Sequence, residues 1–307
     1  MIHRRHAVLA TVLIAITLPA AFALGEAVSF YLHNRANGSI VSSGEKREYM
    51  LYVPNSYDRT KPAPLVISMH GAGGWPAQQM NMTRWNRLAD SERFIVVYPS
   101  GADAPCPRIW HVGEEPGLMN DVRFIAELID KLKASYNIDA KRIYANGFSN
   151  GGGMAFVLSC TLSNRIAAVG MVGPAQTLPW SWCTDRRPVP MIWFHGTADP
   201  YAPYNGGVSP IAPETVRFAN VPMWTTKWAV RNRCSPKSIE SAFAPGVTRR
   251  EYTGCAGGAT VILYSVNAGH QWFGGEPFPD WFVGPSSSNV DATAEMWKFF
   301  RAHPLHG

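Results

Sequence analysis

The feature that most constrains this chain is the stretch NGFSNGGG at 146–153, in which four glycines surround Ser149. The apolar run IYA at 143–145 precedes it and the segment MAFVL at 154–158 follows it, so the stretch joins an expected strand to an expected helix. In such a tight turn the serine backbone is strained, and a side chain at Gly147 or Gly151 would collide with the neighbouring strand or helix. An ordinary turn also uses glycine, asparagine and serine, so the rest of the chain must separate the two interpretations.

Short apolar runs alternate with amphipathic segments along the chain, which is the pattern of strands and crossover helices. We therefore expect an α/β fold with a mostly parallel central sheet flanked by helices. The expected strands are 48–53, 64–69, 94–98, 142–145, 167–172, 189–194 and 260–266. The expected helices are 121–136, with Asn120 as N-cap, then 150–162 and about 290–302.

The first 23 residues have the pattern of an export signal. Arg4 and Arg5 precede the apolar run 7–18, and Ala21-Phe22-Ala23 offers a small-x-small cleavage site. We expect a signal peptide at 1–23, a single catalytic domain at 24–307, and a secreted or periplasmic protein with no stable membrane insertion after cleavage. An uncleaved anchor is the alternative, although the apolar run is short for a membrane span.

Composition argues against several other classes of partner. Without Arg4 and Arg5 the chain keeps 26 basic against 22 acidic residues, and they are scattered, so no nucleic-acid surface is expected. Metal-binding patterns such as Cys-x-x-Cys and His-Glu-x-x-His do not occur, so we expect no metal and no cofactor.

Five cysteines in an exported chain predict disulfides, with one cysteine left over. From their positions in the expected elements we pair Cys160 with Cys183 and Cys234 with Cys255, leaving Cys106. Other pairings of the five remain open.

A serine hydroxyl becomes a nucleophile when a base takes its proton and an acid orients that base. In a fold with this serine turn, both groups follow the serine, the acid first. Asp199 follows the strand 189–194, and His270 follows the strand 260–266. We predict the triad Ser149, Asp199 and His270. The alternative for Asp199 is a turn residue before proline.

Four other histidines compete with His270 for the role of base: His111, His195, His303 and His306. His111 precedes the serine, His195 directly ends a strand, and the other two lie in the C-terminal tail. None of them has the expected position in the chain, so His270 is favoured.

The negative oxygen of a tetrahedral intermediate needs backbone N–H donors. Asn150 supplies one, and the loop MHGAGG at 69–74 supplies the second from Ala72 or a neighbouring glycine. A phosphate-binding loop is the alternative, but no Lys-Ser or Lys-Thr follows the glycines.

Together these motifs resemble secreted esterases related to polyhydroxybutyrate depolymerases and feruloyl esterases, which have the α/β-hydrolase fold. The resemblance rests on PLVISMHGAGG at 64–74, WNRLADSERFIVVYPSG at 85–101, NDVRFIAELIDKLKASYNIDAKRIYANGFSNGGGMA at 120–155, RPVPMIWFHGTADPYAPYNGG at 187–207 and GHQWFGG at 269–275. It implies a cofactor-free serine carboxylic-ester hydrolase with Ser149, Asp199 and His270 as its triad.

The resemblance implies an ester substrate, either a polyhydroxyalkanoate oligomer or an aryl- or acyl-polysaccharide ester. We expect Trp272, two residues after His270, to form a wall of the substrate pocket, where an aromatic face suits an aryl ester, a sugar or a hydroxyacyl chain. At least half of the tryptophans in loops or at element ends are expected to be buried. These are Trp75, Trp85, Trp110, Trp180, Trp182, Trp224 and Trp272.

Two other functions remain open. A serine peptidase of the prolyl-oligopeptidase type has the same triad order, and a non-catalytic polymer-binding hydrolase relative has the same fold. The second normally shows a broken triad, whereas all three residues are present here.

Overall fold

The computed structural model describes residues 36–102, 108–185, 187–211 and 216–305, together with Gly25 and Val28. The chain divides into two units, Met1–Arg35 and the compact unit Ala36–Gly307. The expected signal peptide and Cys106 lie outside the described residues. Within the described part of the chain, no helix is long and apolar enough to cross a membrane.

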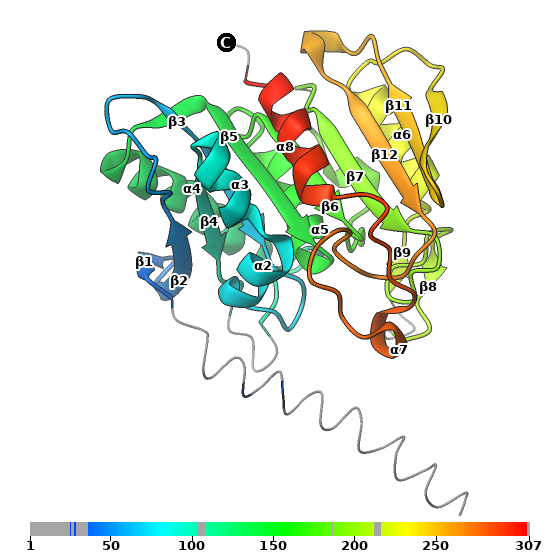
Figure 1. The fold of residues 1–307 in the computed structure, drawn as a ribbon, viewed down its shortest axis with the longest axis horizontal. Coiled ribbons are helices and arrows are strands. Elements are labelled where there is room, and N and C mark those ends of the chain that lie inside the picture. The colour runs from blue at the N-terminus through cyan, green and yellow to red at the C-terminus, as the bar shows by residue number, and fades with distance from the viewer. Residues whose placement is uncertain are drawn as a thin grey trace, which may run out of the picture. The chain divides into compact units, whose positions relative to one another are not determined.

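The compact unit is built on a 10-stranded sheet in the order β1-β2-β4-β3-β5-β6-β7-β12-β11-β10 (Figure 1). Its strands are β1 (Gly38–Ser42), β2 (Glu45–Tyr52), β3 (Ala63–Met69), β4 (Ile95–Pro99), β5 (Ile138–Phe148), β6 (Ala168–Val172), β7 (Met191–Gly196), β10 (Ile239–Ala244), β11 (Val247–Tyr252) and β12 (Val261–Val266). The strands from β4 to β12 in this order pair in parallel, and the outer strands pair antiparallel. The predicted α/β fold with a mostly parallel sheet is confirmed.

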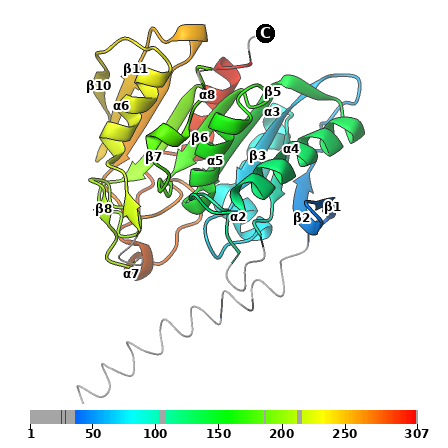
Figure 2. The ribbon, with the colours of Figure 1, turned by 180° about the vertical axis from the view of Figure 1, so that it is seen from behind.

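Helices cover both faces of the sheet (Figures 1 and 2). One face carries α4 (Leu118–Ser135), α5 (Asn150–Thr161) and α6 (Val221–Arg231), and the other carries α2 (Pro76–Thr83), α3 (Trp85–Glu92) and α8 (Ala292–Ala302). Alternate residues of β3 enter the two cores, because Leu65 and Ile67 belong to the cluster with α4 and α5, whereas Val66 belongs to that with α3 and α8. Burial on both faces explains the continuous apolar runs of the inner strands.

Several shorter elements lie in the connections between the longer strands and helices. They are the two-stranded sheet of β8 (Gly207–Val208) and β9 (Arg217–Phe218), the short helix α7 (Asp280–Val283), and the 3-10 turns Trp180–Trp182 and Ala256–Gly258. α7 lies at the end of the sheet toward which β7 and β12 point (Figure 1).

The structure corrects one predicted helix start. α4 begins at Leu118 with Gly117 as N-cap, so Asn120 lies inside the helix. The sequence favoured Asn120 because asparagine caps helices well, but no side-chain cap is used here. Asp121 instead points its carboxylate at Arg47 and His111.

Two disulfides join segments of the compact unit. Cys160 at the end of α5 is bonded to Cys183, and Cys234 after α6 is bonded to Cys255. Both predicted pairings are confirmed, and each closes a short stretch of chain on the α5–α6 side of the sheet.

Candidate active site

Ser149 lies between β5 and α5 with a backbone that non-glycine residues rarely adopt, at φ 51° and ψ −117°. The flanking glycines have no room for a side chain. A Cβ on Gly147 would lie 2.2 Å from the carbonyl carbon of Gly151, and one on Gly151 would lie 2.3 Å from the carbonyl oxygen of Met69. The collisions expected from the sequence are therefore present, and they involve backbone atoms that cannot move aside.

Asp199 and His270 form a buried pair at the ends of β7 and β12. The Asp199 Oδ2 atom lies 2.7 Å from Nδ1 of His270, and the two side chains are 0% and 6% exposed. Oδ1 accepts the backbone N–H groups of Tyr201 and Ala202, each at 2.8 Å. Burial alone would raise the pKa of Asp199, but the charge and hydrogen bond of His270 outweigh it and the pKa is lowered. Asp199 is thus held as a carboxylate facing the imidazole.

His195 also faces this carboxylate, with Nε2 3.5 Å from Oδ2 of Asp199, but its two nitrogens are occupied. Nδ1 accepts the indole N–H of Trp193 at 3.0 Å, so the proton is on Nε2, which donates to the carbonyl oxygen of Ala202 at 2.7 Å. Burial lowers the pKa of His195, which keeps it neutral. His195 therefore fixes the loop that carries Asp199, as expected for a packed histidine at a strand end.

Ser149 and His270 each have a neighbour at the end of β6. The Ser149 N–H donates to the carbonyl oxygen of Val172 at 2.9 Å, and a Cβ on the next residue, Gly173, would lie 2.9 Å from Nδ1 of His270. The ring of Phe148 lies 4.7 Å from that of His270. The hydrogen bonds of the described residues do not include one between the Ser149 hydroxyl and His270. The structure therefore joins the acid to the base and brings Phe148, the residue before Ser149, against the imidazole, whereas the meeting of Ser149 with His270 stays a prediction.

The loop after β3 lies against the serine. A Cβ on Gly71 would be 3.3 Å from Cβ of Ser149. The Gly73 N–H donates to the carbonyl oxygen of Arg108 at 2.8 Å, and the Gly74 N–H donates to that of Gly71 at 3.0 Å. Over the described ranges no hydrogen bond uses the N–H of Ala72, and Asn150 begins α5, where N–H groups have no partner within the helix. Ala72 and Asn150 thus keep backbone N–H groups that other described residues do not use, and their role as donors to the substrate stays a prediction.

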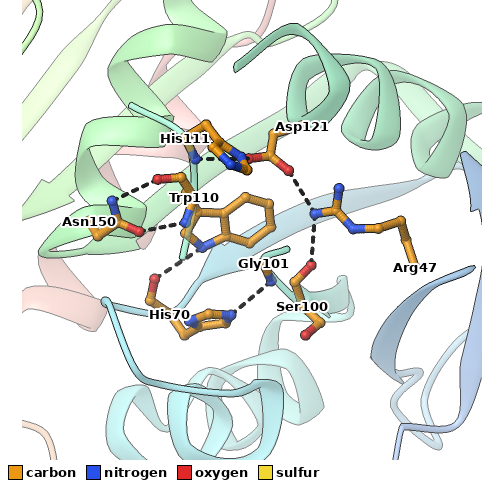
Figure 3. A network of polar contacts seen from close by, with 8 residues as sticks. All are labelled: Arg47, His70, Ser100, Gly101, Trp110, His111, Asp121 and Asn150. Carbon is orange, nitrogen blue, oxygen red and sulfur yellow. Dashed lines mark hydrogen bonds and ion pairs between the residues drawn. The ribbon is translucent and has the colours of Figure 1, made fainter. Parts of the chain in front are cut away.

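His70 holds this loop in place (Figure 3). Its Nε2 accepts the N–H of Gly101 at 2.9 Å, so Nδ1 carries the proton and donates to the carbonyl oxygen of Gly71 at 2.7 Å. The indole of Trp110 donates to the carbonyl oxygen of His70 at 3.1 Å. Burial lowers the pKa of His70 to about 4, so the ring stays neutral.

Asn150 is held by its side chain as well as by the helix. Its amide accepts the N–H of Trp110 at 2.6 Å and donates to the carbonyl oxygen of the same residue at 2.9 Å (Figure 3). The loop carrying Trp110 is fixed in turn by Asp121, which bonds the backbone and ring of His111 at 2.8 Å and the buried Arg47 at 2.8 Å. Sequence reasoning missed this support, because nothing in the spacing of these residues indicates that they meet.

Trp272 is packed in the core, and its expected place in a wall of the substrate pocket stays a prediction. The side chain is 2% exposed and belongs to the core cluster with Trp85 and Phe300. Its indole N–H donates to the hydroxyl of Thr293 at 2.9 Å, which draws the ring into the α8 side of the sheet. Of the seven tryptophans considered, five are buried, as expected.

Similarity to known proteins agrees with this geometry. Residues 47–175 match a family model described as esterase PHB depolymerase. The chain is 30% identical over 227 residues to feruloyl esterase B of Piromyces equi, covering 73% of this chain and 42% of that protein. It is 29% identical over 264 residues to feruloyl esterase C of Emericella nidulans, covering 83% and 84%.

A bifunctional acetylxylan esterase/xylanase of Neocallimastix patriciarum is 35% identical over 156 residues, covering 51% of this chain and 22% of that protein. The chain thus spans less than half of the Piromyces and Neocallimastix proteins. Among solved structures, an acetyl xylan esterase from Aspergillus awamori superposes with a TM-score of 0.60 at 16% identity, covering 86% of this chain and 98% of that one. This likeness shows a shared fold.

Proposed function

We propose that this chain, whose residues 47–175 match the family model described as esterase PHB depolymerase, is a serine esterase that hydrolyses carboxylic esters with Ser149, His270 and Asp199. The observation that carries the proposal is the buried 2.7 Å pair of Asp199 and His270 beside a serine on a strained turn. An ordinary strand end needs neither a buried carboxylate–imidazole pair nor a serine with a strained backbone.

The first half of the reaction transfers the acyl group to the enzyme. His270 Nε2 takes the proton of the Ser149 hydroxyl while the oxygen bonds to the ester carbonyl carbon. The carbonyl oxygen becomes negative and is held by the N–H groups of Ala72 and Asn150. The bond to the alcohol oxygen then breaks, and His270 returns its proton to that oxygen, which leaves as a free alcohol.

Water completes the cycle. His270 takes a proton from a water molecule, whose oxygen attacks the acyl carbon, and the bond to Ser149 breaks as the proton passes to the serine oxygen. Asp199 remains ionised throughout, because it accepts two backbone N–H groups in addition to the imidazole N–H. Its role is to hold the ring orientation and to stabilise the imidazolium.

The names of the relatives support an ester of a plant-wall polysaccharide, feruloyl or acetyl, and the family model supports a polyhydroxyalkanoate oligomer. We include both classes in the proposal. Two disulfides fit an oxidising compartment, which supports an exported protein with a signal peptide at 1–23 and a catalytic domain at 24–307.

The first prediction concerns the nucleophile. We expect Ser149→Ala to lower kcat/KM for p-nitrophenyl butyrate by about 10⁴-fold, because the acyl-enzyme cannot form. Ser91→Ala is the matched control, since this exposed serine on α3 bonds only the carbonyl oxygen of Leu88. Equal turnover by Ser149→Ala and the parent, both folded by circular dichroism, would refute the assignment.

A serine peptidase remains the alternative with the same triad. It predicts cleavage of peptide p-nitroanilides at rates above those for esters of similar acyl groups. A non-catalytic relative predicts turnover of neither, with retained binding to a polymer film.

A further inference from the structure

A strip of aromatic side chains runs from the proposed base to the surface. We define the aromatic strip as Phe148, Tyr201, Phe278, Trp281 and Phe282. Tyr201 and Phe148 flank His270, with ring centroids 5.1 Å and 4.7 Å from the imidazole. The strip begins at the group that handles the proton.

The outer part of the strip continues these contacts without a break. Phe282 lies 5.6 Å from Tyr201 and 6.3 Å from Phe278, and Trp281 lies 5.8 Å from Phe282, all between ring centroids. Trp281 is 54% exposed and Phe282 is 38% exposed. Large exposed aromatic groups that adjoin a reactive site typically form part of a ligand surface.

The helix α7, which carries Trp281 and Phe282 of the strip, is fixed to the histidine loop. The His270 N–H donates to the carbonyl oxygen of Val283 and the Gly269 N–H to that of Pro285, both at 2.7 Å. The side-chain amide of Gln271 donates to the carbonyl oxygen of Gly284 at 3.2 Å. α7 therefore keeps its aromatic side chains at a set position relative to the imidazole.

The chemistry of the reaction decides which part of an ester lies there. His270 must reach the leaving alcohol oxygen within about 3 Å to return its proton. The proposed donors of Ala72 and Asn150 belong to the loop after β3 and the start of α5, whereas Tyr201 contacts the imidazole and joins it to Phe282. The group attached to the leaving oxygen thus lies nearest the side chains around His270.

We propose that the aromatic strip, and Trp281 and Phe282 in particular, binds the alcohol part of the ester and selects alcohols that carry a ring. This inference rests on the proposed esterase function. A ring offers a flat face, either an aryl ring or the C–H face of a pyranoside, that packs on exposed indole and phenyl groups. A methyl or ethyl alcohol has no such face and gains little from the strip.

The test compares esters that share one acyl group. Methyl butyrate, benzyl butyrate and a methyl glucopyranoside carrying a 6-O-butyryl group all yield the same butyryl-enzyme, so differences in kcat/KM report the alcohol. For Trp281→Ala and Phe282→Ala, we expect the preference for benzyl over methyl butyrate to fall about three- to tenfold. The glucopyranoside shows whether a sugar ring gains as much from the strip as an aryl ring.

Two further variants separate the strip from general effects. Trp281→Phe keeps a ring at the same place and should restore most of the preference. Phe243→Ala removes an aromatic side chain that is 42% exposed on the distant strand β10, and it should leave the preference unchanged. Thermal unfolding of each variant shows whether the fold is intact.

Three results would overturn the inference. In the first, the preference for benzyl over methyl butyrate stays the same in Trp281→Ala. In the second, all three esters are hydrolysed more slowly by the same factor. In the third, the variants lose only adsorption to a polyester film, which would make the strip a docking surface for the polymer. If the parent protein hydrolyses none of the esters, the proposed function itself fails and the inference with it. If the parent hydrolyses them and only the preference is unaffected, the inference alone fails.

Discussion

At the scale of single residues, three buried histidines have different roles because their ring nitrogens have different hydrogen-bond partners. His70 and His195 each have one nitrogen that accepts an N–H group and one that donates to a carbonyl oxygen, which keeps them neutral. Nδ1 of His270 lies against the Asp199 carboxylate, and within the described part of the chain its Nε2 makes no hydrogen bond. Only the last arrangement suits a group that takes up and returns a proton.

The pKa of His70 gives a prediction for stability. The folded-state pKa of His70, about 4, lies below the ordinary value of 6.5. The neutral ring therefore makes its full contribution to the free energy of unfolding above pH 6.5. As the pH falls from 6.5 to 4, the unfolded state takes up the proton first, and about 3 kcal/mol of unfolding free energy is lost. Urea unfolding at several pH values measures this loss.

His70→Gln is the variant that isolates this effect, because its amide oxygen can still accept the Gly101 N–H but does not titrate. We expect its unfolding free energy to depend less on pH over the same range. An identical slope in parent and variant would show that other groups cause the pH dependence.

At the scale of elements, the turn between β5 and α5 depends on glycine for space and not only for backbone freedom. We expect Gly151→Ala to lower the unfolding free energy by about 3 kcal/mol, since its Cβ would press on the carbonyl oxygens of Met69 and His70 at 2.3 Å and 2.5 Å. Gly113→Ala is the control, because a Cβ there would meet nothing closer than 3.7 Å. Similar denaturation midpoints for the two variants would contradict the steric explanation.

The elements that the sequence predicted well are those buried on both sides. Runs such as PLVISM and FIVVY form the inner strands β3 and β4, because parallel strands covered by helices are apolar throughout. The outer strands β1, β10 and β11 were not predicted. β10 is exposed along most of its length, so no burial imposes a hydrophobic pattern on it. β5 begins at Ile138, earlier than the predicted start at 142. The prediction missed this first part because it is polar.

At the scale of the whole molecule, the two disulfides brace the α5–α6 side of the sheet. They close stretches with sequence separations of 23 and 21 residues. Loops of this size predict that each bond contributes about 3 kcal/mol by restricting the unfolded chain. We expect the double variants Cys160→Ser with Cys183→Ser, and Cys234→Ser with Cys255→Ser, each to lose about that amount in guanidinium unfolding. Double variants as stable as the parent would show that the bonds do not restrict the unfolded state.

The sequence by itself determined the class of fold and the order of the predicted triad, because local patterns carry that information. An apolar run, a glycine-serine turn and a helix must follow one another in the chain, and Asp199 and His270 each follow an apolar run that forms a strand. Position along these elements favoured two cysteine pairings but left the others open, and the structure decided between them.

Only the tertiary structure decided which side chains support and surround the site. Trp272 and Trp281 are both aromatic residues shortly after His270, yet one is 2% and the other 54% exposed. Trp272 is drawn into the core by Thr293 on α8, 21 residues away, and a contact between distant segments leaves no local pattern in the sequence. The same holds for Asp121, whose partner Arg47 lies 74 residues away and reaches it because the chain folds β2 beside α4.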